Sequence, residues 1–322
     1  MFASMVSAIS NFMYSYLLII MLIGVGLYYT FRTRLVQVRL FRETIRVILE
    51  KPVGNHEQPV SSFQALMIST ASRVGTGNII GISTAICLGG YGAVFWMWVI
   101  AIVGGASAFI ESTLAQIYKK RGEHSSYGGP AYYIEAALNS RALAVLFSMS
   151  LIATYGVGFN MLCAYNLQST FIAYEFYNPE TTPWVIGAVL AVFVAWCLLG
   201  GGKRIIRATS TLVPIMGVIY ISVAFILAIL HIDLIPGMLN SIFSEAFDFQ
   251  AIFSGMAGSC MMYGIKRGLY SNEAGVGSAP NAAAAADVSH PVKQGLVQML
   301  SVFIDTLLVC TATAFMCLSS GI

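Results

Sequence analysis

Eight long apolar runs leave this chain few ways to fold. They lie at about 12–31, 62–89, 92–118, 142–172, 183–200, 208–231, 249–265 with a continuation to 288, and 294–320. A helix needs about 20 consecutive apolar residues to cross the hydrocarbon core of a bilayer. Only 10% of the 322 residues are charged, whereas soluble proteins carry about 25%. The sequence therefore predicts an all-α polytopic membrane protein.

Lysine and arginine are concentrated in every second loop between these runs. The basic loops are 32–51, 119–141, 200–207 and the one that holds Lys293. Because such loops stay in the cytoplasm, we predict that the N-terminus lies outside and that the chain crosses the plasma (inner) membrane several times. No Lys or Arg precedes the first run, so we expect a retained helix and not a cleavable signal peptide. The net charge of +3 gives no indication of a nucleic-acid partner.

Residues 36–50, "VQVRLFRETIRVILE", form an amphipathic pattern. At helical spacing one face collects the charged residues Arg39, Arg42, Glu43, Arg46 and Glu50. The other face is largely apolar: Leu40, Phe41, Ile45, Ile48 and Leu49. We predict one helix in the cytoplasmic interface, either as a connector held to lipid or in a regulatory role. With the first apolar run it makes up an N-terminal unit, residues 1–61.

The stretch "ASRVGTGNIIG", residues 71–81, interrupts the second apolar run with glycines and polar residues. A dinucleotide fingerprint would need a preceding strand and an acidic residue about 20 positions on. Here no acidic residue occurs before Glu111, so the nucleotide interpretation fails. An interrupted membrane helix is tolerated where its unwound backbone is buried in protein and lines a cavity. We therefore predict a helix broken at Gly75–Asn78.

A second interruption is predicted within 264–288. Glycines and a proline flank Ser271, Asn272 and Glu273: Gly264, Gly268, Gly275, Gly277 and Pro280. Lys266 and Arg267 are expected at the inner edge of this break. Two interrupted helices in one membrane chain point to a transporter site.

The spacing of the two interrupted helices predicts an inverted repeat. Counted from the helix at 62–89, the second interrupted helix is the sixth, so the first repeat has five helices, and an odd number reverses the orientation of the following repeat. We assign 62–231 to a first five-helix repeat. Residues 232–322 then begin a second, inverted repeat with helices six and seven only.

Three blocks of sequence carry a family resemblance. They are "RVGTGNIIGISTAICLGGYGAVFWMW", "GGPAYYIE" and "GIKRGLYSNEAGVGSAPNAAAAADVSHPVKQGLVQMLSVFIDTLLVCTATA". They resemble the signature blocks of the alanine or glycine:cation symporter family, and the resemblance covers nearly the whole chain. It implies a LeuT-type fold, a sodium ion as the usual coupling ion and small neutral amino acids as the usual substrates.

The chain departs from the family pattern at three places. Tyr91 stands where the family usually has proline. Cys163, Ala164 and Tyr165 stand where a Gln-Ala-Asn stretch would contact substrate, which leaves the transported amino acid open. The sequence reaches Ile322 after the seventh of ten core helices, so we expect an incomplete second repeat and little uptake by this chain alone. A truncated relative that inserts without transporting is the alternative.

Several residues at the interruptions suit a buried sodium ion, which needs oxygen atoms in place of water. The predicted sodium ligands are Asn78, Thr76, Asp305 and Thr306. The predicted substrate-binding residues are Gly75, Thr76, Gly77, Asn78, Ser271, Asn272 and Cys163. Capping of half-helix ends is the alternative role for the polar residues among them.

Three charged residues within apolar segments need partners, and Glu111 is expected nearer the cytoplasmic end of its helix. We predict structural or gating ion pairs for Arg73, Glu273 and Glu111. For Glu273, neutralising a cation and pairing with Arg73 both stay open. For Asp305, an ion pair with Arg73 or Arg267 is the alternative to cation binding.

These features together predict a secondary active transporter and not an enzyme. It would carry a small neutral amino acid, alanine or glycine, with sodium by alternating access. No cofactor is expected, because sodium is a co-transported substrate; the partners are the amino acid, sodium and the lipid bilayer. A channel would favour rings of like residues, and an intramembrane enzyme would need a nucleophile with its base or a metal set. The six cysteines form no CxxC pair and indicate neither disulfides nor zinc.

Overall fold

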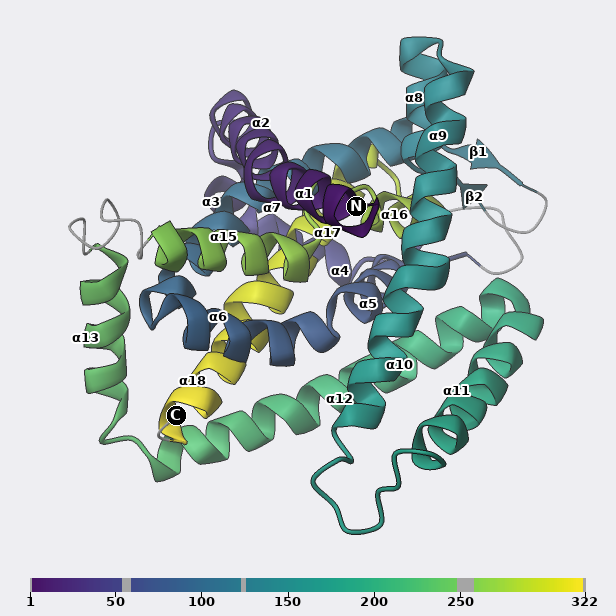
Figure 1. Ribbon diagram of the computed structural model, residues 1–322. Helices are drawn as coiled ribbons and strands as arrows, with labels where there is room; N and C mark the ends of the chain where they lie inside the picture. Colours follow the sequence, from purple (N-terminus) through teal and green to yellow (C-terminus); the bar gives the residue numbers. More distant parts are fainter. Residues whose placement is uncertain (1, 54–58, 123–125, 248–257, 321–322) are drawn as a thin grey trace.

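The chain folds almost entirely into α-helices (Figure 1). The computed structural model describes residues 2–53, 59–122, 126–247 and 258–320. In these parts, five helical stretches are long and apolar enough to cross a membrane. They are Gly92–Ile117, Arg141–Ser169, Thr182–Leu199, Gly201–Leu230 and Pro291–Ser319. The prediction of an all-α polytopic membrane protein is confirmed.

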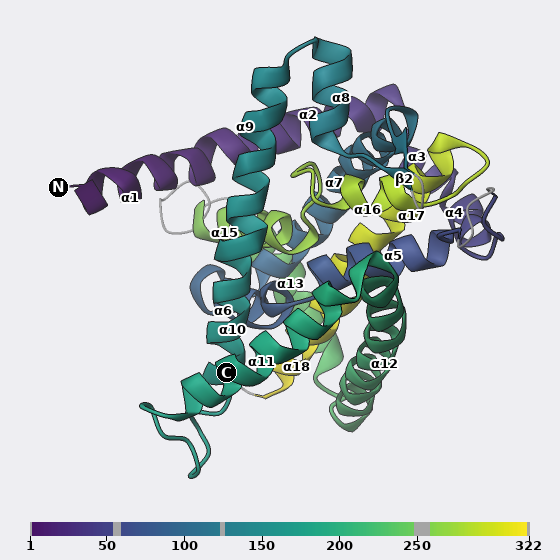
Figure 2. The same ribbon diagram turned by 90° about the vertical axis from the view of Figure 1, so that its right-hand side faces the viewer.

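The N-terminal helices form one long rod that reaches beyond the rest of the bundle (Figure 2). Helix α1 (Phe2–Phe12) continues through a π-helical stretch, η1 (Met13–Leu17), into α2 (Leu18–Arg32). Helicity thus begins ten residues before the predicted 12–31 run. Gly26 lets α2 approach its neighbour closely, since a Cβ there would lie 2.6 Å from Val103 Cγ1.

The predicted amphipathic helix is in fact two short helices, α3 (Val36–Arg39) and α4 (Phe41–Ile48). The side of α4 that is buried in the protein is distinct from the apolar face that we predict to meet lipid. Thr44 and Val47 are buried where α4 packs against α17 (Pro291–Phe303), whereas Phe41 and Ile45 are exposed. Burial follows the neighbouring helix, whose position the sequence pattern does not reveal.

Helix α7 (Gly92–Ile117) runs through the centre of the fold. It packs against α15 (Gly258–Asn272), α17 and α16 (Ala279–Ala285). Small residues permit these contacts, because a Cβ on Gly105 would lie 3.0 Å from the Phe303 ring. Helix α7 therefore contacts the elements on both sides of the second interruption, α15 and α16.

Long apolar helices cover one side of this centre (Figures 1 and 2). They are α9 (Arg141–Ile152), η3 (Ala153–Phe159), α10 (Asn160–Ser169), α11 (Thr182–Leu199) and α12 (Gly201–Leu230). Their most apolar windows are only 0–6% buried, so the faces that they expose are suited to lipid. Shorter elements that the sequence did not predict occupy the connections: β1 (Lys120–Arg121), β2 (Ser126–Tyr127), α8 (Pro130–Leu138) and α13 (Ile235–Ala246).

The first predicted interruption is present as a gap in the helix. Helix α5 (Ser62–Arg73) starts with a capping box between Ser61 and Gln64 and ends at Arg73. Val74 is extended, with ψ 100°. The π-helical η2 (Gly77–Gly81) and α6 (Ile82–Gly89) then follow. The glycines therefore stand where the hydrogen-bond ladder stops.

The second interruption begins later than predicted. Helix α15 passes through Gly264 and Gly268 without a break, and the irregular segment is Glu273–Ser278. Lys266 and Arg267, expected at the inner edge of the break, lie within the continuous helix. Gly264 serves packing instead, since a Cβ there would lie 2.4 Å from the Ala93 carbonyl oxygen of α7.

Candidate functional site

Asp305 lies at the centre of a buried polar cluster. Its Oδ1 accepts a hydrogen bond from Asn78 Nδ2 at 2.6 Å, and its Oδ2 accepts bonds from Ser271 Oγ at 2.8 Å and Thr306 Oγ1 at 2.9 Å. The Cys310 Sγ lies 3.2 Å from both Asn78 Nδ2 and Ser271 Oγ. All five residues are 0–1% exposed. We call this set the Asp305 cluster.

Three separate elements supply the Asp305 cluster. Asn78 comes from η2 after the first interruption, and Ser271 from the last turn of α15 before the second. Asp305, Thr306 and Cys310 come from η4 (Ile304–Cys310), the π-helical stretch between α17 and α18 (Thr311–Ser319). A π-helix bonds residue i to i+5, which places Asp305 and Cys310 on one face. The cluster therefore joins both interrupted helices to the last long helix.

Asn78 also holds the first interruption in shape. Its Oδ1 accepts a hydrogen bond from the Gly75 backbone N–H at 2.8 Å, while its amide nitrogen faces Asp305. The capping role and the cluster role thus coexist in one side chain.

Arginine does not neutralise Asp305. Among the described residues, no arginine nitrogen forms a salt bridge with it within 4.0 Å. The alternative ion pair with Arg73 or Arg267 is therefore not formed. The neutral side chains of Asn78, Ser271 and Thr306 donate to the carboxylate instead.

Thr76 lies on the other side of the first interruption. Thr76 is partly exposed and Gly75 is exposed. The Thr76 hydroxyl lies next to the Cys163 thiol of α10. None of the hydrogen bonds in the described part of the chain joins Thr76 to Asp305. The structure thus places Thr76 with Cys163 and apart from the other predicted sodium ligands.

Gly77 and Asn272 are buried in different surroundings. A Cβ on Gly77 would lie 3.1 Å from the Tyr270 ring, so glycine permits the contact between η2 and α15. The Oδ1 of Asn272 accepts the Ala274 backbone N–H at 3.0 Å, which shapes the second interruption. Its side chain lies beside Gly104 of α7. Asn272 is therefore outside the Asp305 cluster.

Glu273 links the two interruptions. Its Oε2 accepts hydrogen bonds from Ser72 in the last turn of α5, at 3.4 Å, and from Ser278 before α16, at 2.5 Å. Its φ of 50° lies in the left-handed region, which is costly for a residue with a side chain. Such strain persists only where the surroundings impose it.

Arg73 is buried without a direct carboxylate partner. Its Nη1 donates to the Gln298 carbonyl oxygen at 3.4 Å, and its Nε and Nη2 have no hydrogen-bond partner among the described residues. The charge of Arg73 acts electrostatically on both Glu273 and Glu111. In the described ranges, no salt bridge within 4.0 Å joins Arg73 to either carboxylate. Glu111 instead accepts the Gly275 backbone N–H at 3.3 Å. The predicted ion pairs are therefore near neighbours and not contacts in this structure.

An aromatic stack beside the interruptions escaped the sequence analysis. The rings of Tyr155 and Phe159 stack with centroids 4.8 Å apart, and Phe159 stacks on Tyr270 at 5.7 Å. The Tyr155 hydroxyl lies next to Glu273 and Ser278. Only the four-residue spacing of Tyr155 and Phe159 hinted at a shared helix face.

The donor set of the Asp305 cluster fits a hard monovalent cation. It offers a carboxylate and the hydroxyls of Ser271 and Thr306, and oxygen atoms are the ligands that such ions prefer. In the described residues no group of three or more His, Cys, Asp or Glu side chains could hold a metal. The oxygen atoms of the Asp305 cluster are thus ligands of the type that a hard cation prefers.

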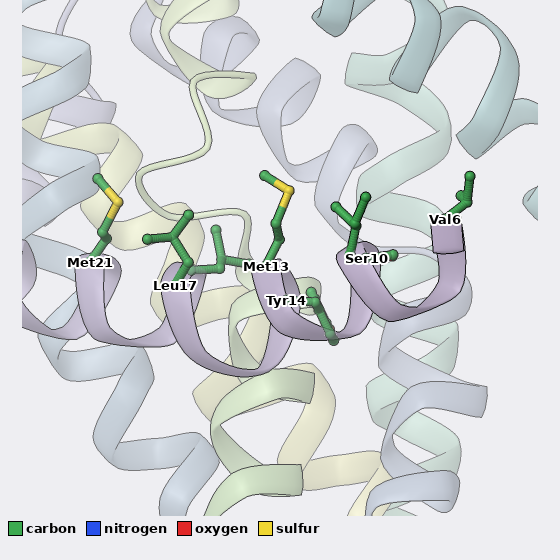
Figure 3. A pocket seen from close by; sticks show the side chains of 8 residues that line it. Val6, Ser10, Met13, Tyr14, Leu17 and Met21 are labelled. Carbon is green, nitrogen blue, oxygen red and sulfur yellow. The ribbon is translucent and has the colours of Figure 1, made fainter. Parts of the chain in front are cut away.

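A groove of about 480 Å³ lies elsewhere, along one face of the N-terminal rod (Figure 3). Its lining comes from α1, η1 and α2 alone: Val6, Ile9, Ser10, Met13, Tyr14, Leu17, Leu18 and Met21. None of these side chains is charged. The groove therefore offers a surface for apolar groups and no ion chemistry.

The sequence profile of the sodium:alanine symporter family matches residues 1–322. A probable sodium/glutamine symporter of Bacillus subtilis is 46% identical over 312 residues, an alignment that covers 97% of this chain and 64% of the relative. An amino-acid carrier protein of the same organism is 46% identical over 317 residues, covering 98% of this chain and 67% of the relative. A sodium/alanine symporter of Methanococcus maripaludis is 38% identical over 328 residues, covering 100% and 71%. The chain thus spans about two thirds of the length of these curated relatives.

Proposed function

The chain belongs to the sodium:alanine symporter family, and on that premise we propose that the protein couples sodium entry to the uptake of a small neutral amino acid, alanine or glycine. Members of this family are transporters and not enzymes. Substrate and ion would bind between the two interrupted helices, and alternating access would expose them to each side in turn. No cofactor takes part, since sodium is itself transported.

The Asp305 cluster is the observation that supports this proposal. It unites a carboxylate with two hydroxyls at the point where both interruptions meet the last helix. We assign sodium to Asp305, Ser271 and Thr306, with Asn78 as the residue that orients Asp305. The Asn78 amide donates to Asp305 Oδ1, and a sodium ion would compete with this donor for the carboxylate.

The amino acid would occupy the exposed side of the first interruption. Gly75 and Thr76 leave backbone and hydroxyl groups accessible there, opposite Cys163. The N–H groups that begin a half-helix attract a substrate carboxylate. Gly77 and Asn78 shape this end of the half-helix, and Ser271 adjoins it from α15. Asn272 would act indirectly, through the shape of the second interruption.

Arg73, Glu273 and Glu111 are proposed as gating residues. The guanidinium of Arg73 has unused donors within electrostatic range of both carboxylates. A small movement of α5 or α15 would therefore convert near neighbours into an ion pair. We propose that such a pair closes one side of the site during the transport cycle.

The alternative within the same family is a different amino acid. One relative bears the name of a sodium/glutamine symporter and another that of a sodium/alanine symporter. Cys163 departs from the expected Gln-Ala-Asn stretch next to the proposed substrate position. We therefore expect Cys163, which lies beside Thr76, to determine which amino acid is transported.

The experiment is uptake by the purified full-length protein in liposomes. One sodium ion that enters down 100 mV contributes about 2.3 kcal/mol, roughly a fiftyfold accumulation. We expect labelled alanine or glycine to accumulate with an inward sodium gradient and not with an equal potassium gradient. Alanine or glycine uptake that does not depend on the sodium gradient would refute the coupling. Sodium-driven uptake of glutamine alone would support the alternative substrate.

A further inference from the structure

A second cavity, of about 390 Å³, lies where the first membrane helix ends. Three arginines line it: Arg32, Arg34 and Arg39. Its remaining walls come from Thr33 and from four apolar residues of three other elements: Val36, Leu40, Phe109 and Val292. We call this cavity the arginine pocket. It combines a concentrated positive charge with an apolar floor.

Protein carboxylates do not neutralise the arginine pocket. Within the ranges that the structure describes, none forms a salt bridge with Arg32, Arg34 or Arg39. Arg39 donates one hydrogen bond, to the Thr33 carbonyl oxygen at 3.2 Å. Toward the described part of the chain, the three exposed guanidinium groups thus leave most of their donors unused, and an anion could accept from them.

The backbone at the pocket adopts a costly conformation. Arg34 and Leu35 are consecutive non-glycine residues in the left-handed region, with φ of 54° and 55°, and such positions cluster at binding sites. Gln37 anchors this turn. Its Nε2 donates hydrogen bonds to Thr30 Oγ1 at 2.8 Å and to the Ile102 carbonyl oxygen at 3.1 Å. The arginines are therefore presented by a turn that is anchored to α2 and α7.

Exposed apolar side chains surround the arginine pocket. Phe31 is 75% exposed, Leu35 53% and Val38 72%. Beside the cytoplasmic end of a membrane helix, such side chains fit the boundary between acyl chains and headgroups. A ligand for this place needs an anionic head next to an apolar body.

We propose that the arginine pocket binds the phosphate headgroup of an anionic phospholipid from the cytoplasmic leaflet. Guanidinium groups form bidentate hydrogen bonds to phosphate oxygens, and basic pockets beside membrane helices bind anionic headgroups. The acyl chains lie along Phe31, Leu35 and Val38. This site is separate from the Asp305 cluster and does not depend on the transport proposal.

The test counts lipid retained by purified protein, using native mass spectrometry in a neutral detergent. Wild-type protein is titrated with phosphatidylglycerol, with phosphatidylcholine, or with inorganic phosphate as a competitor. The pocket variant carries Arg32→Gln, Arg34→Gln and Arg39→Gln. The matched control removes the same charge from three exposed arginines elsewhere: Arg121→Gln, Arg141→Gln and Arg207→Gln.

Each arginine near an anionic surface contributes about fivefold in affinity, so the pocket variant should need roughly a hundredfold more phosphatidylglycerol. The control variant should retain the lipid as wild type does, and phosphatidylcholine should not bind at the same concentrations. Equal losses in both variants would show that net charge alone acts and would overturn the site. Complete displacement of the lipid by millimolar inorganic phosphate would assign the pocket to a soluble anion and overturn the lipid.

A charge-conserving variant covers the case in which the glutamine variant does not fold. It carries Arg32→Lys, Arg34→Lys and Arg39→Lys, which keep the charge and lose the bidentate geometry. We expect it to bind phosphatidylglycerol several-fold more weakly than wild type. Unchanged affinity would contradict recognition of phosphate by the guanidinium groups.

Discussion

We propose that Asp305 serves both the fold and the binding of an exchangeable sodium ion. Its two oxygens accept bonds from an amide and two hydroxyls, all of them neutral. A permanent partner such as arginine would compete with a cation, whereas neutral donors can turn away when an ion arrives. Among the described residues no arginine forms a salt bridge with Asp305, so the proposed sodium ion would meet no built-in competitor there.

Replacing Asp305 with asparagine tests this role directly. Asp305→Asn keeps the size of the side chain and removes the charge, so sodium affinity should fall at least about tenfold, since a hydrogen bond or ligand to a charged group is worth about 1.5–3 kcal/mol. The measurement is the sodium concentration that stabilises the purified protein against thermal unfolding. Asp233→Asn, at an exposed position, is the matched control and should leave that concentration unchanged. An unaltered sodium dependence in Asp305→Asn would remove this residue from the ion site.

At the scale of elements, the sequence predicted which segments meet better than it predicted how they are shaped. Asn78, Ser271 and Asp305 were each recognised as polar residues at membrane depth, and the structure brings them together. Cys310 was missed because the periodicity that predicts helix faces assumes 3.6 residues per turn, whereas η4 is π-helical. The glycine pattern predicts a break that includes Gly264, because a glycine that permits packing and one that ends a helix look alike in sequence.

Gly264 therefore supplies a prediction about the contact between α15 and α7. A Cβ at this position would meet the Ala93 carbonyl oxygen at 2.4 Å, and backbone cannot move aside cheaply. Gly264→Ala should lower the free energy of unfolding by about 1–3 kcal/mol, seen as a lower apparent Tm in detergent. Gly217→Ala in α12 is the control: nothing lies within 4 Å of its Cβ, and alanine is favoured in helices by about 0.5–1 kcal/mol. Equal Tm values for the two variants would mean that Gly264 is not a packing glycine.

At the scale of the whole molecule, the packing of the helices and the charge of the loops together predict how the chain lies in the membrane. The scaffold helix α7 and the interrupted helices occupy the centre, while α9 to α12 expose apolar faces for lipid. The arginine pocket lies at the end of α2, in the first of the basic loops that we place in the cytoplasm. The orientation of the chain therefore decides whether that pocket can meet the anionic leaflet at all.

Single cysteines introduced into loops of opposite charge test that orientation. Glu175 lies in an acidic loop and Lys120 in a basic one, and both are exposed. Because basic loops stay in the cytoplasm, a membrane-impermeant maleimide should label Glu175→Cys in intact cells, and Lys120→Cys only after the cells are permeabilised. The exposed Cys87 and Cys163 are replaced by serine beforehand, and that background without either new cysteine gives the baseline. The opposite labelling pattern would place the N-terminus inside and move the arginine pocket to the outer surface, where phosphatidylglycerol binding would need another explanation.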